Sequence, residues 1–362
     1  MISVIIPVYN AGSYLKNILN ALYRQTYHDI EIILVDDGSS DDSIEVIRSC
    51  QKLDGRIRYI SCEHCGVSFA RNVGIDQANG EYIRFLDADD QIPNDSMEKM
   101  VYTMDSDEEI DLLIGSYHSN SNQIAYFEPK ELNGKTEIRE FINEFARSSM
   151  TYYYGVVWNK LYKKEIIDRN HIRFDEQVEW CEDLLFNLKY YRNCRFVYYL
   201  REYIYEYVNS ENSVTWGLKR KIGVKHLTEI NQYRYQKSIE LIEAFGCDTQ
   251  EFTDTWKYLR LKADLNDIAG FFSGKGEYCK YRNIRKRYYE MHKILSTGEN
   301  RDLLRRRYLA DPDWMVRMLY NLSIRERYGI IYVLILMKDF IIVHASFLRK
   351  YWNKRERKGS IL

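Results

Sequence analysis

Three aspartates within four positions, Asp87, Asp89 and Asp90, directly follow the strand-like run IRFL that begins at Ile83. Closely spaced carboxylates can hold a hard divalent cation, because Mg²⁺ and Mn²⁺ prefer carboxylate oxygens together with phosphate oxygens and water. A competing interpretation is a solvated acidic turn, in which one aspartate caps the helix that enters at Pro93. The position of these acids at the end of a buried strand favours the cation site.

A second acidic pair, Glu182 and Asp183, opens the segment EDLLFNLKYY, in which Leu185, Leu188 and Tyr191 mark the buried side of a helix. Neighbouring residues of a helix point in different directions, so we expect one acid to act and the other to orient or cap. A carboxylate of this kind can act as general base and remove the proton of a hydroxyl group. The alternative is a pair of acids that only complements the positive end of the helix dipole.

The first hundred residues predict the elements that position these acids. ISVIIPVY, EIILVDD, IRYISCE and EYIRFLDAD are nearly continuous apolar runs of strand length, and such runs are typical of strands that are covered on both faces. Helical stretches lie between them; in one, Leu15, Ile18, Leu19 and Leu22 recur at helical spacing. Regular alternation of strand and helix predicts an α/β fold with a mostly parallel sheet and helices on both faces.

Polar residues stand where each of these strands ends, and in such sheets ligands bind outside the carboxyl ends of the strands. The four ends are Tyr9-Asn10, Asp36-Asp37-Gly38, Glu63-His64 and Asp87-Ala88-Asp89-Asp90. We therefore expect these residues to converge on one ligand site.

Five motifs occur in the order and spacing of the bacterial family 2 glycosyltransferases of the capsular and exopolysaccharide type. They are ISVIIPVYN, ILVDDGSSDDS, GVSFARNVGI, NGEYIRFLDADD and EWCEDLLFNLKY. The sequence resembles a member of this family over about residues 1 to 210, and five motifs in register are a more specific signal than any one of them. The resemblance implies a GT-A (Rossmann-like) fold, a nucleotide-diphosphate-sugar donor, a divalent metal ion and inversion at the anomeric carbon.

The resemblance also assigns residues to the donor. The residues implied for nucleotide-sugar binding are Pro7, Tyr9, Asn10, Asp37, Gly66, Arg71, Asp87 and Ala88. Tyr9 would stack on the nucleobase, and Asp37 would face the base while Asp36 is structural. Gly66 would permit close approach of the backbone, and Arg71 would bring positive charge to the diphosphate or the base.

For the metal ion, Mn²⁺ or Mg²⁺, the resemblance implies Asp89 as direct ligand and Asp87 as ribose or water-mediated metal contact. Asp90 would orient these acids or reach the acceptor. Asp183 would be the catalytic base, with Glu182 beside it. Trp158, in the segment VVWNKLYKKEII, would lie beneath the acceptor sugar, or would simply pack in the core.

Composition limits the remaining possibilities. The chain has 362 residues with a net charge of −1, so no global field points to nucleic acid as a partner. Seven cysteines, an odd number, predict a reducing compartment rather than a disulfide framework. The opening MISVIIPVY lacks the basic region and cleavage site of a signal peptide, so we expect a cytoplasmic protein.

Three regions are predicted: a nucleotide-sugar-dependent transferase domain at 1–214, a helical accessory region at 215–327, and an apolar and basic C-terminal helix at 328–362. The last is interrupted by Lys338 and Asp339, which disfavours a clean membrane span. We interpret it as an interfacial helix on the inner face of the cell membrane, a peripheral contact that suits a lipid-linked acceptor. A helix buried against the domain or a second subunit is the alternative.

The sequence as a whole predicts transfer of a sugar from a UDP-sugar to a saccharide acceptor, in the synthesis of a cell-surface polysaccharide. One rival is a sugar-phosphate nucleotidyltransferase, for which PVYNAGSYLKN lacks the expected glycine-rich, basic phosphate loop. Another is a non-catalytic nucleotide-sugar-binding or scaffold subunit, which the presence of Asp89 and Asp183 disfavours.

Overall fold

The computed structural model describes residues 1–119, 133–148, 152–208 and 224–258, with the single positions 293, 298, 300 and 302. The chain divides into two compact units, Met1–Phe252 and Thr253–Leu362, and every element named below belongs to the first. The C-terminal helix expected at 328–362 and most of the accessory region lie outside the described residues. The predicted domain limits therefore stay predictions.

Strands and helices alternate from the first residues onward, as the two periods of the sequence indicate. In chain order the elements are β1 (Ile2–Val8), α1 (Gly12–Tyr23), β2 (Ile30–Asp36), α2 (Ser43–Gln51), β3 (Ile57–Ser61), α3 (Val67–Gln77), β4 (Tyr82–Phe85), α4 (Ser96–Asp105), β5 (Ile110–Ser119), β6 (Gly134–Glu137), α5 (Ile138–Ser148), α6 (Tyr152–Gly155), β7 (Lys160–Lys163), α7 (Lys164–Arg169), α8 (Glu182–Tyr191), β8 (Phe196–Tyr207) and α10 (Val224–Ala244).

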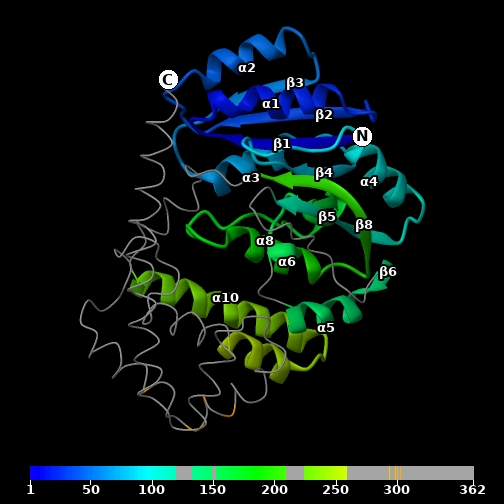
Figure 1. Ribbon diagram of the computed structural model, residues 1–362, viewed down its shortest axis with the longest axis vertical. Helices are drawn as coiled ribbons and strands as arrows, with labels where there is room; N and C mark the ends of the chain where they lie inside the picture. The colour runs from blue at the N-terminus through cyan, green and yellow to red at the C-terminus, as the bar shows by residue number, and fades with distance from the viewer. Residues whose placement is uncertain are drawn as a thin grey trace, which may run out of the picture. The chain divides into compact units, whose positions relative to one another are not determined.

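The described strands form one sheet in the order β3-β2-β1-β4-β7-β5-β8-β6. The pairs among β1 to β4 are parallel, as is β5 with β8, whereas β7 and β6 run antiparallel to their neighbours. Figure 1 shows β3, β2, β1 and β4 side by side at one end of the first unit, with α5 and α10 at the other. The predicted mostly parallel α/β sheet is confirmed.

Register brings the ends of the first strands to one edge. Val8 pairs with Asp36, and Asp36 pairs with Ser61, so the residues after β1, β2 and β3 leave the sheet side by side. Ile5 pairs with Phe85, and the acidic turn begins two residues later, at Asp87. Parallel pairing therefore makes neighbours of motifs that are distant in the sequence.

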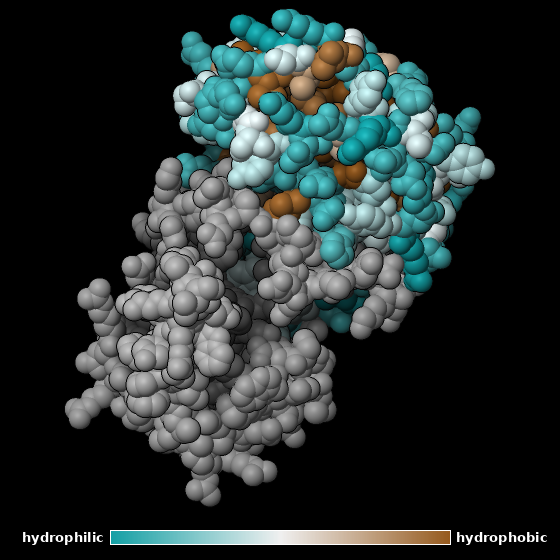
Figure 2. All heavy atoms as spheres, turned by 45° about the horizontal axis from the view of Figure 1, so that its top comes forward, coloured by the Kyte–Doolittle hydropathy of each residue, from teal (hydrophilic) through white to brown (hydrophobic). Residues whose placement is uncertain are grey.

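Burial explains why these elements form. The repeated apolar residues of α1 are all buried, and burying one such side chain stabilises the fold by about 1.5–3 kcal/mol. Helix α3 packs against β1 and β2. At Gly74 a Cβ atom would lie 2.3 Å from the Ile5 side chain, so glycine is needed for this close contact. On the face drawn in Figure 2, hydrophilic side chains cover most of the described surface, and apolar areas are small.

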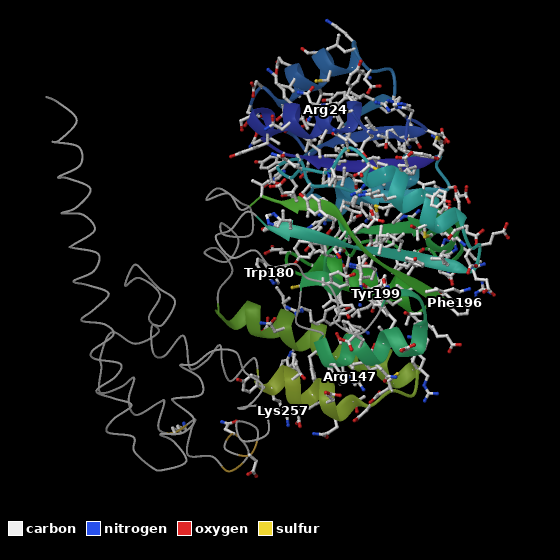
Figure 3. The ribbon with its side chains drawn as sticks, turned by 45° about the vertical axis from the view of Figure 1, so that its right-hand side comes forward. Arg24, Arg147, Trp180, Phe196, Tyr199 and Lys257 are labelled. Carbon is white, nitrogen blue, oxygen red and sulfur yellow. The ribbon has the colours of Figure 1, made fainter. Side chains whose placement is uncertain are left out.

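An aromatic cluster holds α8 on the sheet. The ring of Phe141 in α5 lies 4.8 Å from that of Tyr191 in α8 and 5.8 Å from that of Tyr199 in β8, which is labelled in Figure 3. Helix α10 packs against both α8 and α5. Among the described helices, none is both long and apolar enough to cross a membrane.

Candidate active site

Arg71 joins three of the predicted site residues. It lies in α3 and is only 3% exposed. Its Nη1 donates to Glu182 Oε1 at 3.1 Å and to Asp183 Oδ1 at 2.5 Å, and its Nη2 donates to Asp87 Oδ1 at 3.1 Å. The guanidinium group thereby links the acidic turn after β4 to the start of α8, more than ninety residues further along the sequence.

Both acids of the pair at the start of α8 reach the same nitrogen of Arg71, contrary to the expectation that they point apart. The reason lies in the turn before the helix. Cys181 takes a left-handed conformation, with φ at 66°, and Trp180 before it is labelled in Figure 3. In the first turn of the helix, the longer Glu182 side chain can reach the nitrogen that Asp183 contacts directly.

The segment before α8 is fastened to α3. Asn72 Nδ2 donates to the carbonyl oxygen of Phe174 at 3.1 Å, and the Phe174 N–H donates to Asn72 Oδ1 at 2.9 Å. The Phe174 ring stacks on Phe186 of α8, with ring centroids 4.2 Å apart, and lies 5.3 Å from the guanidinium carbon of Arg71. These contacts fix α8 relative to the helix that carries Arg71.

Arg71 and the three carboxylates that it contacts, those of Asp87, Glu182 and Asp183, are called the Arg71 junction below. They bring three acidic groups to one guanidinium group. Burial lowers the pKa of Arg71, but the carboxylates of Asp183, Asp87 and Glu182 outweigh it and raise that pKa above its ordinary value. Burial also raises the pKa of Asp183; Arg71 opposes this, while Glu182 and Asp87 reinforce it. Arg71 therefore stays a cation, and the Asp183 carboxyl holds its proton more tightly than a solvated aspartate.

In the acidic turn, both carboxylate oxygens of Asp90 accept hydrogen bonds from other residues of the protein. It is buried and accepts hydrogen bonds from the Tyr205 hydroxyl at 2.5 Å and the Val208 N–H at 2.8 Å. Burial, with the charges of Asp87 and Asp89, raises its pKa to about 8. These contacts attach the turn to the end of β8.

Asp89 differs from Asp90 in its contacts. Within the described part of the chain, the only hydrogen bond that favours its ionised form comes from its own backbone, and burial together with Asp87 raises its pKa to about 6. Asp87 uses Oδ1 to accept from Arg71. These oxygens suit a hard cation, and no three acidic, histidine or cysteine side chains of the described residues are arranged to hold a metal alone.

At the end of β1, Tyr9 is 48% exposed, and its ring stacks on His64 with centroids 4.3 Å apart and planes at 19°. Asn10, with φ at 49°, accepts the Ser40 N–H at Oδ1 and donates its own N–H to the Ser39 hydroxyl. Tyr9 thus has an aromatic surface open to solvent, while Asn10 holds the loop after β2.

Asp37 is buried, and its carboxylate accepts hydrogen bonds from the loop before α3. Its Oδ1 accepts the Cys65 N–H at 2.8 Å, its Oδ2 accepts the Gly66 N–H at 2.9 Å, and His64 Nδ1 lies 3.0 Å from Oδ2. Gly66 caps α3 with φ at 97°, a conformation that explains glycine there. Asp36 is also buried, and its Oδ2 has no hydrogen-bond partner within the described residues.

The remaining predicted residues lie at or near this edge. Pro7 is partly buried in β1, opposite Val35, and Ala88 is buried in the acidic turn. Trp158 is only 4% exposed and stacks on Tyr205, with centroids 4.2 Å apart and planes at 9°. Its described contacts are those of the core-packing alternative, and an acceptor role stays a prediction.

Two residues near the site, Tyr205 and Lys160, escaped the sequence reasoning. Tyr205 joins Asp90 to Trp158, whereas His64, which was expected at its strand end, covers one face of Tyr9. Lys160 is fully buried, and its Nζ donates to the Tyr153 carbonyl at 3.0 Å. Lys160 follows Trp158 in the same motif, so a charged residue inside an apolar run was the available signal.

Comparison with known proteins places this geometry in a family. The profile described as glycosyl transferase family 2 matches residues 3–170. The uncharacterized glycosyltransferase EpsJ of Bacillus subtilis (strain 168) is 33% identical over 248 residues, which cover 68% of this chain and 71% of EpsJ.

Two solved structures share the fold. The S. aureus TarS 1–349 structure in complex with UDP-GlcNAc aligns with a TM-score of 0.58 at 18% identity, over 91% of this chain and 88% of that one. The mannosyltransferase PcManGT from Pyrobaculum calidifontis, in complex with GDP-Man and Mn²⁺, aligns with a TM-score of 0.50 at 14% identity, over 98% and 87%. The chain belongs to glycosyl transferase family 2, and it is a glycosyltransferase with the GT-A fold.

Proposed function

We propose that this glycosyltransferase moves a sugar from a UDP-sugar to a saccharide acceptor, with inversion at the anomeric carbon. The observation that carries the proposal is the Arg71 junction, because it joins the acidic turn to the Glu182-Asp183 pair. A sugar transferase needs a site for the departing diphosphate beside a base for the incoming hydroxyl. The UDP-GlcNAc complex of the structural neighbour supports the choice of donor.

Asp183 is the proposed base. It would take the proton of the acceptor hydroxyl while that oxygen attacks the anomeric carbon and the bond to the diphosphate breaks. Burial raises its pKa and so makes its carboxylate a stronger base, while the bond to Arg71 fixes its direction. Glu182 keeps Arg71 paired when Asp183 becomes protonated.

Asp89 and Asp87 are the proposed residues for Mn²⁺ or Mg²⁺, an ion that would neutralise charge on the departing diphosphate. Five carboxylates lie at or beside the junction, those of Asp87, Asp89, Asp90, Glu182 and Asp183, and Arg71 is the cation that contacts three of them. A divalent cation would offset this excess of negative charge.

Nucleotide binding by the purified protein tests the donor and the metal together. Melting is followed with UDP, GDP and CDP, each with and without Mn²⁺, because a ligand that binds only the native state raises the melting temperature. We expect stabilisation by UDP that needs Mn²⁺ and is lost in Asp89→Asn. Asp95→Asn is the matched control, since Asp95 is half exposed and pairs with Lys99 at the surface. No shift with any nucleotide would favour the scaffold alternative.

Product analysis separates the enzymatic alternatives. A transferase releases UDP from a UDP-sugar, whereas a nucleotidyltransferase joins UTP to a sugar 1-phosphate and releases pyrophosphate. We expect UDP release with a panel of UDP-hexoses and UDP-N-acetylhexosamines. Pyrophosphate release from UTP and a sugar 1-phosphate, with no UDP release from any UDP-sugar, would overturn the proposal.

We further propose that the acceptor is a lipid-linked saccharide of cell-surface polysaccharide synthesis, and that the protein acts at the inner face of the membrane. The apolar and basic character of 328–362 supports this. Deleting residues 328–362 should release the protein from sedimenting membranes, and unchanged sedimentation would contradict a membrane role for this segment.

A further inference from the structure

Two cysteines stand in the loop between β3 and α3, three residues apart, in the order Cys62-Glu63-His64-Cys65. A C-x-x-C pair between a strand and a helix is an arrangement typical of redox-active dithiols. Both cysteines are free thiols in this structure. In a reducing compartment, such a pair forms a disulfide only transiently, as a catalytic or sensing event.

This loop holds the two aspartates after β2. The Cys62 N–H donates to the Asp36 carbonyl at 2.8 Å. The N–H groups of Cys65 and Gly66 donate to the two oxygens of the Asp37 carboxylate, at 2.8 and 2.9 Å. The loop between the cysteines also carries His64, whose ring stacks on Tyr9. The conformation of the dithiol segment therefore sets the geometry of the strand ends where the nucleoside is proposed to bind.

Closing a disulfide would compete with this arrangement. The Cα atoms of a disulfide lie about 4.4–6.8 Å apart, so a bond between residues three apart requires a tight turn. In this structure the Cys65 N–H is directed to the Asp37 carboxylate, and within the described loop no backbone hydrogen bond joins it to the Cys62 carbonyl. Formation of the turn would pull Cys65 away from Asp37.

Exposure gives the two thiols different roles. Cys65 is exposed, whereas Cys62 is partly buried. Burial raises the pKa of the Cys62 thiol, and the nearby Asp37 carboxylate adds to the effect. Cys65 is therefore the thiol that an oxidant in solution meets first, and Cys62 is the one that resolves the intermediate.

We propose that Cys62 and Cys65 are a redox-active pair, and that their oxidation by a low-molecular-weight disulfide releases the loop from Asp37 and weakens nucleotide binding. The effect on nucleotide binding rests on the proposed function, whereas formation of the disulfide does not.

The chemistry balances with glutathione disulfide as oxidant. The Cys65 thiolate attacks one sulfur of glutathione disulfide, which forms a mixed disulfide and expels one glutathione thiolate. The Cys62 thiolate then attacks the Cys65 sulfur and expels the second glutathione thiolate. Two protein thiols are oxidised to one disulfide, two glutathione thiols are formed, and the two protein protons pass to them.

Oxidation itself is tested on the full-length protein with glutathione disulfide, followed by peptide mass spectrometry and amide hydrogen exchange. We expect a Cys62–Cys65 peptide that is lighter by two hydrogen atoms, and faster exchange of the Cys65 and Gly66 amides; both changes are reversed by dithiothreitol. Cys62→Ser and Cys65→Ser should abolish the linkage. Cys50→Ser is the matched control and should retain it, because Cys50 is another partly buried thiol outside the loop.

Calorimetric titration with UDP and Mn²⁺ tests the coupling. We expect oxidised wild type to bind UDP at least tenfold more weakly than reduced protein, and Cys65→Ser to be insensitive to the oxidant. A lasting Cys65–glutathione mixed disulfide, or a Cys62–Cys65 bond that leaves amide exchange and UDP affinity unchanged, would overturn the inference. If reduced protein fails to bind UDP, the proposed donor is wrong, and the peptide and exchange measurements still decide whether the pair is redox-active.

Discussion

Acidic side chains at two strand ends of the same sheet are satisfied in opposite ways. After β2, the Asp37 carboxylate is held by backbone N–H groups of Cys65 and Gly66, which are neutral donors from one loop. After β4, Asp87 shares the single cation Arg71 with the two acids of α8. The Asp37 carboxylate is satisfied by these neutral donors, whereas the second end carries more negative charge than its described partners balance. An acid that ends a strand can therefore be structural or poised for a cation, and its donors distinguish the two cases.

Removing the shared cation gives the largest expected effect. Arg71→Ala leaves three carboxylates close together without their partner, and breaking a buried pair from one side costs about 3–5 kcal/mol. Urea unfolding measures this loss. Arg173→Ala, which removes a surface pair with Asp76, should cost about 1 kcal/mol or less. Equal losses in the two variants would remove the distinction between the junction and an ordinary ion pair.

Neutralising the proposed base should affect turnover without affecting donor binding. Asp183→Asn keeps the size of the side chain but cannot accept the hydroxyl proton, so we expect kcat to fall about 10²–10⁴-fold. UDP affinity should stay close to that of wild type. Glu182→Gln is the matched control and should lose less activity. Asp183→Asn with nearly normal turnover would exclude Asp183 as the base.

At the other strand end, truncating Tyr9 should weaken the donor by a smaller amount. Stacking of a base on an aromatic ring contributes about 1–3 kcal/mol, so Tyr9→Ala should raise the Kd for UDP by roughly tenfold or more. Tyr9→Phe should preserve the affinity, and Tyr102→Ala, which changes an exposed tyrosine elsewhere, should not alter it. Titration calorimetry provides the measurement. Unchanged binding in Tyr9→Ala would mean that the base lies elsewhere.

The smallest expected effect is a shift in the pH profile. A base works only when deprotonated, so kcat/KM should rise with pH through the pKa of Asp183, which burial raises above its ordinary value. The negative charge of Glu182 adds to this increase. Glu182→Gln should therefore lower the pKa and move the acid limb to lower pH. A move to higher pH would contradict this assignment, because the loss of a competitor for Arg71 should also lower the pKa of Asp183.

The parallel half of the sheet could be predicted from the sequence because short patterns determine it. Continuous apolar runs specify buried strands, and parallel register then places the residues after β1, β2 and β4 at one edge. No sequence pattern reveals which of several acids an arginine contacts. The three bonds of Arg71 depend on the Asn72–Phe174 contact and on the left-handed turn at Cys181, both of which are tertiary features.

Trp158 illustrates a different limit of prediction from the sequence. An aromatic residue in a motif can line a pocket or fill a core, and only its neighbours decide between the two. Tyr205, which stacks on Trp158, alternates with other tyrosines along β8, and that alternation gives no indication of its contact with Asp90. The C-x-x-C spacing of Cys62 and Cys65 stands in the sequence but was missed in the prediction from it, and its relation to Asp37 required the loop geometry.

The stack of Trp158 on Tyr205 gives the molecule an optical reporter of its acidic turn. Indole emission responds to charges and hydrogen bonds nearby. Trp158 stacks on the ring of Tyr205, and the hydroxyl group of Tyr205 donates a hydrogen bond to Asp90. Binding of a cation beside Asp90 should therefore change the fluorescence of this tryptophan without any added label. The difference between wild type and Trp158→Phe would isolate that signal from the other five tryptophans of the chain. Events at the site could then be followed in real time by stopped-flow mixing.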